Sequence, residues 1–205
     1  MTATFGDRLQ ERLPRRLAGS TGGWPLWARA AAVFLALRVV TWVLMARAAD
    51  GAGYYPGVQG PAEGDIDLAL NWDAVWYERI FTGGYPDELP VGPDGRVQQN
   101  PWAFYPVYPY AVRVVARLLG SDFATVAPLL ALAAGLGAAV VMARLLVESL
   151  PARPEDPRRA ETLALAAVAV WAACPVTPVL QMAYTESFSM LLLVTFLLLL
   201  VREQW

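Results

Sequence analysis

The stretch LWARAAAVFLALRVVTWVLMARA, residues 26–48, decides the fold class of this chain. As a helix it would be about 34 Å long, enough to cross the hydrocarbon core of a bilayer at a tilt. Further long apolar blocks follow it, and 57% of all residues are hydrophobic. The sequence therefore predicts an all-α integral membrane protein rather than a soluble domain.

We expect a short N-terminal segment followed by a multi-pass membrane domain. Residues 1–25 carry more Arg than acid, which places them in the cytoplasm. The apolar block that follows is too long for a cleavable signal peptide. Residues 26–205 form the membrane domain, with spans at about 26–48, 123–147, 162–180 and 185–201. Small residues between 133 and 139 suit close packing of the second span in lipid.

The segment at about 50–105 is predicted to be a long outer loop that contains short helices. It holds nine acidic residues and two Arg, a net charge of −7, which suits the outer face. Its length and its aromatic content indicate more than a connector.

The next segment, about 104–119, decides the topology. If it crosses the membrane, the Arg-rich link near residues 151–160 lies outside. If it is re-entrant or interfacial, that link lies inside, and the turn at 184–187 lies on the same side as Asp73. The number of Arg residues in the link favours the second arrangement.

The residue types narrow the chemistry. All 16 basic residues are Arg, and the chain has no His. Proton transfer near neutral pH must therefore use a carboxylate, a Tyr or Cys174, the one cysteine. The lack of His excludes an intramembrane Ser-His protease, and a single Cys excludes an internal disulfide.

Asp73 is the strongest candidate for a base. A helix that begins at Asp65 and stops at Gly83 would place Asp73 on an otherwise apolar face, one turn from Tyr77. Burial on that face would make Asp73 a better base. The alternative is a structural carboxylate that caps a loop or pairs with Arg79 or Arg38.

Other polar residues also have two interpretations. Asp65 and Asp67 form a pattern that can hold a divalent metal, but we favour capping acids of a first helical turn. Arg38 lies inside the first span and needs a partner, for which we favour an acid over a lipid phosphate. Glu186 either complements a helix dipole or lies at the mouth of a site shared with Asp73.

Aromatic rings and prolines crowd residues 99–110. One interpretation is the aromatic belt of a membrane interface. The other is a rigid wall for a sugar or a polyprenyl chain. The two are compatible.

Four short motifs occur in order over about 115 residues: Trp72-Asp73-Ala74-Val75-Trp76-Tyr77, Gly84-Tyr85, Ala103-Phe104-Tyr105-Pro106-Val107-Tyr108-Pro109 and Tyr184-Thr185-Glu186-Ser187. Together with an Arg in the first span, they resemble the GPI mannosyltransferase 2 (PIG-V) family and its bacterial relatives. The resemblance implies a GT-C-like multi-span helical bundle that transfers a sugar, often mannose, from a polyprenyl-phosphate donor with inversion. Asp73 matches the family's base. The residues we assign to substrate binding are Arg38, Trp72, Trp76, Tyr77, Tyr105, Tyr108, Tyr184 and Glu186.

The resemblance also implies the setting. The partners would be the polyprenyl-phosphate sugar donor and a lipid, glycan or protein acceptor in a bacterial plasma membrane, with no nucleic acid. The resemblance fixes no cofactor, and a divalent metal is left open. Four spans are about half of what the family uses, so we expect further spans in a longer chain. The alternative is a non-catalytic membrane subunit or small-solute carrier in which Arg38 and Asp73 form an ion pair.

Overall fold

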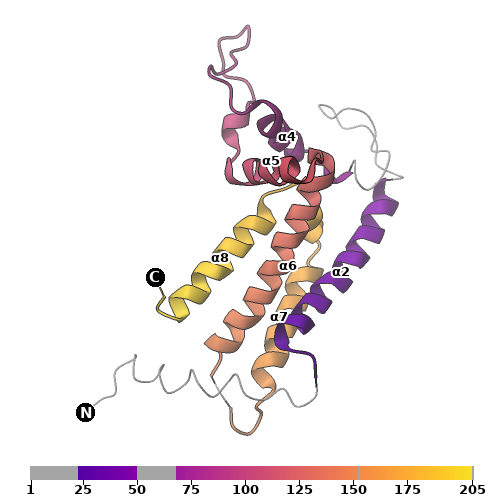
Figure 1. Ribbon diagram of the computed structural model, residues 1–205, viewed down its shortest axis with the longest axis vertical. Helices are drawn as coiled ribbons and strands as arrows, with labels where there is room; N and C mark the ends of the chain where they lie inside the picture. The colour runs from indigo at the N-terminus through magenta and orange to yellow at the C-terminus, as the bar shows by residue number, and fades with distance from the viewer. Residues whose placement is uncertain (1–22, 50–67, 152, 205) are drawn as a thin grey trace, which may run out of the picture.

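The computed structural model describes residues 23–49, 68–151 and 153–204 (Figure 1). Within these ranges the secondary structure is helical, apart from an isolated antiparallel bridge between Val91 and Val97. The elements in chain order are α2 (Leu26–Ala49), α4 (Asp73–Gly83), η1 (Pro101–Ala103), α5 (Val107–Leu119), α6 (Phe123–Ser149), α7 (Arg159–Ala173), η2 (Thr177–Gln181) and α8 (Glu186–Val201). The predicted all-α class is confirmed for these residues.

Helix α6 is the centre of a bundle and packs against α2, α7 and α8. Residues Leu26–Ala48 of α2 and all of α6 are long and apolar enough to cross a membrane, and α8 is a shorter apolar helix. The segment predicted as a third span, over 162–180, is not one continuous helix. Helix α7 begins at Arg159 and ends at Ala173, and Cys174 leaves the helical conformation before Pro175. A residue before proline is driven out of the helical region, so the chain continues as the short η2 turn.

Helix α5 lies across one end of the bundle, above the start of α6 (Figure 1). Its 13 residues extend only about 20 Å. Gly120 ends it in the left-handed conformation, and the Asp122 side chain then accepts a hydrogen bond from the Thr125 N–H at 2.9 Å to begin α6. This sharp corner turns the chain from the end of the bundle into its long axis.

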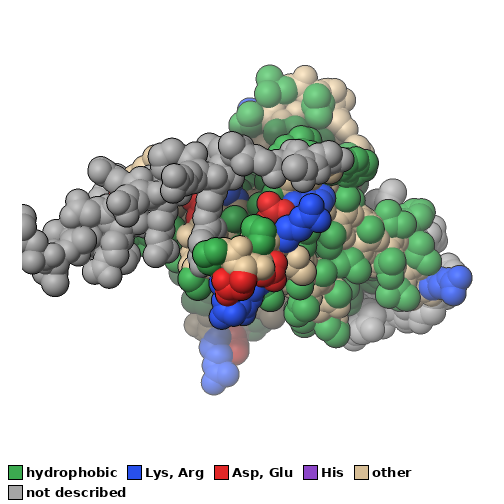
Figure 2. All heavy atoms as spheres, turned by 90° about the horizontal axis from the view of Figure 1, so that it is seen from below, with side chains coloured by type: hydrophobic (Ala, Val, Ile, Leu, Met, Phe, Trp, Pro, Cys, Tyr) green, Lys and Arg blue, Asp and Glu red, His purple; other side chains and the backbone are tan. Residues whose placement is uncertain are grey.

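The corner fixes which segments share an end of the bundle. Helices α4 and α5 and the start of α8 lie at one end (Figure 1). The link between α6 and α7 lies at the other end, where α2 begins. Figure 2 views the molecule from that second end, where side chains of both charges gather and hydrophobic side chains flank them. The membrane side that each end faces stays a prediction.

Small residues let the helices approach α6 closely. The buried face of α6 is mostly alanine, together with Gly135. A Cβ on Gly135 would lie 2.9 Å from Cζ of Phe34 and 3.2 Å from Oγ of Ser187. Phe34 is fully buried and stacks on Trp171 at 5.8 Å between ring centroids, so it has little room to yield. Gly135 is therefore a contact point for α2 and for the start of α8.

We expect Gly135→Ala to lower the stability of the bundle by about 1–2 kcal/mol, because overpacking outweighs the gain in helix propensity. Thermal unfolding in detergent measures the change. Gly137→Ala is the matched control. Its Cβ would meet only the flexible end of Leu191, at 3.3 Å and 3.5 Å, so its stability should equal or exceed wild type. Equal melting temperatures for the two variants would show that Phe34 can shift.

Candidate functional site

Helix α4 does not form the continuous helix predicted from Asp65. Asp65 and Asp67 lie outside the described residues. The helix begins at Asp73, and the preceding Trp72 has a φ of 54°. A bulky residue in the left-handed region is uncommon and costs of order 1–3 kcal/mol, and such strain is concentrated at functional sites. The break interrupts the predicted apolar face, because residues on either side of it no longer share one helical axis.

Asp73 is placed differently from the prediction. The buried residues of α4 are Ala74, Tyr77 and Ile80, and the Asp73 side chain is exposed in the first turn. An acid at this position complements the helix dipole. Neither proposed Arg partner pairs with it. Arg79 stacks over the Trp76 ring, and Arg38 donates to the carbonyl oxygens of Ala172 and Thr177. Exposure leaves the carboxylate accessible from solution.

Two hydrogen bonds hold the segment before α8 against the segment before α4. The Ala183 N–H donates to the Ala69 carbonyl oxygen at 2.9 Å. The Tyr184 hydroxyl donates to the Asn71 carbonyl oxygen at 3.2 Å. Both Tyr184 and Asn71 are buried. These bonds bring the starts of α4 and α8 together, although they lie far apart in the sequence.

The result is a carboxylate–tyrosine cluster, defined as Asp73, Tyr77, Tyr108, Tyr184 and Glu186. Burial raises the pKa of Tyr77, and the negative charges of Glu186 and Asp73 raise it further. Burial also raises the pKa of Tyr184. A hydrogen bond with the Asp73 backbone lowers this pKa, and the negative charges of Asp73 and Glu186 raise it further. The charges of both carboxylates thus raise the pKa values of the same two tyrosines. The phenols stay neutral near pH 7 and can donate hydrogen bonds.

Tyr108 is the most deeply buried member of the cluster. It is fully buried, and its hydroxyl donates to the Ala127 carbonyl oxygen at 2.8 Å. Its ring meets Tyr77 edge-on at 5.3 Å and Phe188 at 5.4 Å between centroids. The predicted substrate contact is therefore corrected. Tyr108 joins α4, α5, α6 and α8 and has no surface left for a substrate.

The remaining aromatic candidates are distributed over the surface. Trp76 stacks on Phe104 at 5.8 Å, and the Arg79 guanidinium lies 4.5 Å from its ring centroid. Trp72 is 44% exposed and Tyr105 is 76% exposed. Phe104, which was not among the predicted site residues, links Trp76 to Tyr77, whose ring it meets edge-on at 5.3 Å between centroids. Its place in the third motif was the available signal.

An open hollow of about 520 Å³ adjoins the end of α4. Two hydrogen bonds hold the wall of this hollow in place. The Tyr85 hydroxyl donates to the Phe104 carbonyl oxygen at 2.7 Å, and Trp102 Nε1 donates to the Pro86 carbonyl oxygen at 3.1 Å. The sequence did not lead us to predict this polar site, although three consecutive amide side chains at 98–100 were a signal for it. The lining side chains that can bind a polar ligand are those of Trp76, Arg79, Tyr85, Glu88, Gln98, Gln99 and Asn100.

Arg38 has neither of the predicted partners. Its guanidinium is buried and donates to the carbonyl oxygens of Ala172 and Thr177, and to the Thr177 hydroxyl at 3.1 Å. It also lies 5.4 Å from the Phe34 ring centroid. The expected ion pair is thus replaced by two carbonyl groups. That of Ala172 lies at the C-terminal end of α7, which carries partial negative charge, and that of Thr177 lies in the first residue of η2. This position is in the core between α2 and α7, apart from the carboxylate–tyrosine cluster.

Within the described ranges, no group of three or more His, Cys, Asp or Glu side chains is placed to hold a metal ion. The two metal candidates, Asp65 and Asp67, lie outside those ranges.

A comparison with protein-family models, curated proteins and solved structures found no match.

Proposed function

We propose that this chain is a membrane glycosyltransferase of the GT-C type that moves a sugar, mannose by the motif resemblance, from a polyprenyl-phosphate donor to an acceptor hydroxyl on the outer face. One observation carries the proposal. Asp73 and Glu186 come from distant segments, act on the same buried phenols, and lie at the end of the bundle that carries the open hollow.

In the proposed reaction the acceptor oxygen attacks the anomeric carbon, and the bond from that carbon to the lipid phosphate breaks. The Asp73 carboxylate takes the hydroxyl proton. A base must come within hydrogen-bond reach of that proton, and the exposure of Asp73 permits it. Glu186 is the second carboxylate, and neutral Tyr77 is the nearby hydrogen-bond donor.

The lipid phosphate leaves with a negative charge that needs a cation. Arg38, the residue first considered, is occupied by carbonyl groups in the core. Arg113 is also engaged, because it donates to the carbonyl oxygens of Ile80 and Phe81. Arg79 lines the open hollow and follows Asp73 on the same helix. We therefore assign phosphate stabilisation to Arg79, whose guanidinium can bind an oxyanion with two parallel hydrogen bonds.

The non-catalytic alternative required Arg38 and Asp73 to pair. In the structure Arg38 bonds to Ala172 and Thr177 instead, so that alternative has no specific contact in its favour.

A transfer assay tests the proposal. Membranes that contain the protein receive radiolabelled polyprenyl-phospho-mannose and a panel of lipid, glycan and protein acceptors. We expect labelled product that depends on the protein, and cleavage by anomer-specific mannosidases should show inversion. Donors that carry glucose or galactose identify the sugar. If a correctly folded protein transfers no sugar from any donor in the panel, the proposed function is wrong.

A further inference from the structure

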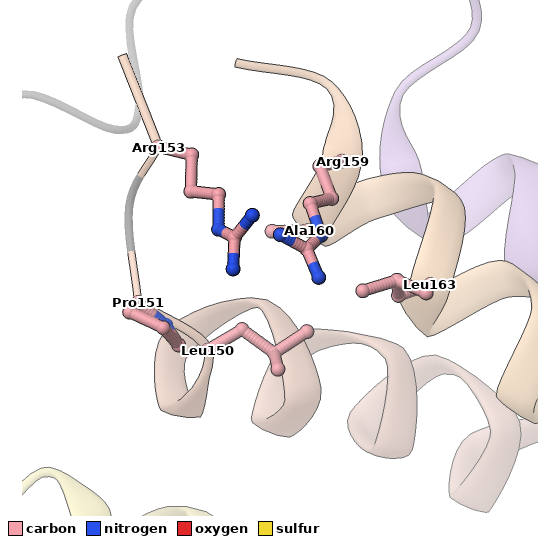
Figure 3. Close-up of a pocket in the computed structure, with 6 residues that line it drawn as sticks. All are labelled: Leu150, Pro151, Arg153, Arg159, Ala160 and Leu163. Atoms are coloured by element: carbon pink, nitrogen blue, oxygen red, sulfur yellow. The ribbon is translucent and has the colours of Figure 1, made fainter. Parts of the chain in front are cut away.

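We propose that Arg153 and Arg159 bind the phosphate of an anionic lipid headgroup, in a hollow at the end of the bundle opposite the carboxylate–tyrosine cluster. The hollow measures about 50 Å³ and lies between the end of α6 and the first turn of α7 (Figure 3). Its lining consists of Leu150, Pro151, Arg153, Arg159, Ala160 and Leu163. This inference is independent of the proposed transferase activity.

The two guanidinium groups point toward one another across the hollow, one from the link and one from α7 (Figure 3). Two like charges that face each other repel, and an anion between them removes the repulsion. A guanidinium also presents a planar fork that matches phosphate oxygens. Two such forks on opposite walls suit one phosphate group better than a carboxylate.

The neighbouring acids do not neutralise this pair. Glu161 pairs with Arg29. Glu148 accepts hydrogen bonds from Arg202 at 2.7 Å and 2.9 Å and from Arg144 at 2.9 Å. In the described part of the chain, Glu155 and Asp156 of the link form no salt bridge with either Arg. The hollow is therefore a local concentration of positive charge, to which the N-terminal end of α7 adds.

The size and the apolar walls point to a lipid. A water molecule needs about 10–15 Å³ of such space, so about 50 Å³ accommodates a larger group. Leu150 and Leu163 give the hollow an apolar side, which an acyl chain or a glycerol backbone can contact. The hollow lies just beyond the end of α6, where a membrane-spanning helix meets the headgroups. Basic pockets between helices at this level bind anionic headgroups.

Lipid binding by the purified full chain tests the inference. Phosphatidylglycerol is added to the protein in a neutral detergent, and bound lipid is counted by native mass spectrometry. We expect Arg153→Gln and Arg159→Gln each to weaken binding about tenfold, which is the effect of losing one charge-assisted hydrogen bond. Arg158→Gln is the matched control. It removes one charge from the same link but does not line the hollow, so its affinity should stay within about twofold of wild type.

Three results would overturn the inference. Equal binding of phosphatidylcholine would show that headgroup charge does not matter. Displacement of phosphatidylglycerol by millimolar inorganic phosphate would assign the site to a soluble phosphate. An equal loss of affinity for phosphatidylglycerol in Arg158→Gln and Arg153→Gln would indicate that the lipid is attracted by the overall charge of the link and not by the hollow. Melting temperatures equal to wild type ensure that a loss of binding reports on the hollow rather than on unfolding.

Discussion

Asp73→Asn is expected to lower sugar transfer by about 10²–10⁴-fold while the protein stays folded, because an amide cannot take the proton of the acceptor hydroxyl. Asn has nearly the same shape as Asp, and the side chain is exposed, so no packing is lost. Its loss of charge removes only a weak interaction with the start of α4. The effect should therefore appear in turnover, with donor binding close to wild type.

Glu78→Gln is the matched control for this variant. Glu78 is an exposed acid on the same helix, and it has no place in the carboxylate–tyrosine cluster. We expect its transfer rate to stay within about twofold of wild type. Equal rates for Asp73→Asn and wild type would eliminate Asp73 as the base. In that case Glu186→Gln becomes the decisive variant, because Glu186 acts on the same two phenols.

Arg38→Met is expected to destabilise the bundle by about 2–4 kcal/mol, because a buried carbonyl oxygen loses its donor. The Thr177 carbonyl oxygen would lose its bond to the guanidinium, while the Ala172 carbonyl oxygen would keep a bond of 3.0 Å from the Thr177 hydroxyl. An apolar residue also removes a buried charge, which offsets part of the cost. The loss of the donor is the larger effect, because the Thr177 carbonyl oxygen, in the first residue of η2, is left buried without the guanidinium.

Thermal unfolding in detergent should show a melting temperature lower by about 4–16 °C for this variant. Arg47→Met, an exposed Arg in the last turn of the same helix, should change it by less than about 4 °C. Arg38→Lys should fall in between, since an ammonium keeps the charge but loses the fork. Arg38→Met with wild-type stability would show that the carbonyl groups find other donors.

The long helices could be predicted because their signal is local. Runs of apolar residues indicated α2, α6 and α8, and Gly120 followed by Asp122 marks the corner between α5 and α6. The helix break at Trp72 could not be predicted in this way. Periodicity assumes a continuous helical axis, and a single positive φ changes the direction of every residue that follows.

The sequence by itself determined that this chain is helical, has long apolar segments and contains 16 Arg and no His. These features depend only on which residues occur and on how many apolar residues follow one another. The tertiary structure decided the partners. It placed Asp73 with Glu186, Arg38 at the end of α7, and Arg153 opposite Arg159. These pairs join segments that are distant in the chain, and a charge finds its partner only when packing brings the two segments together.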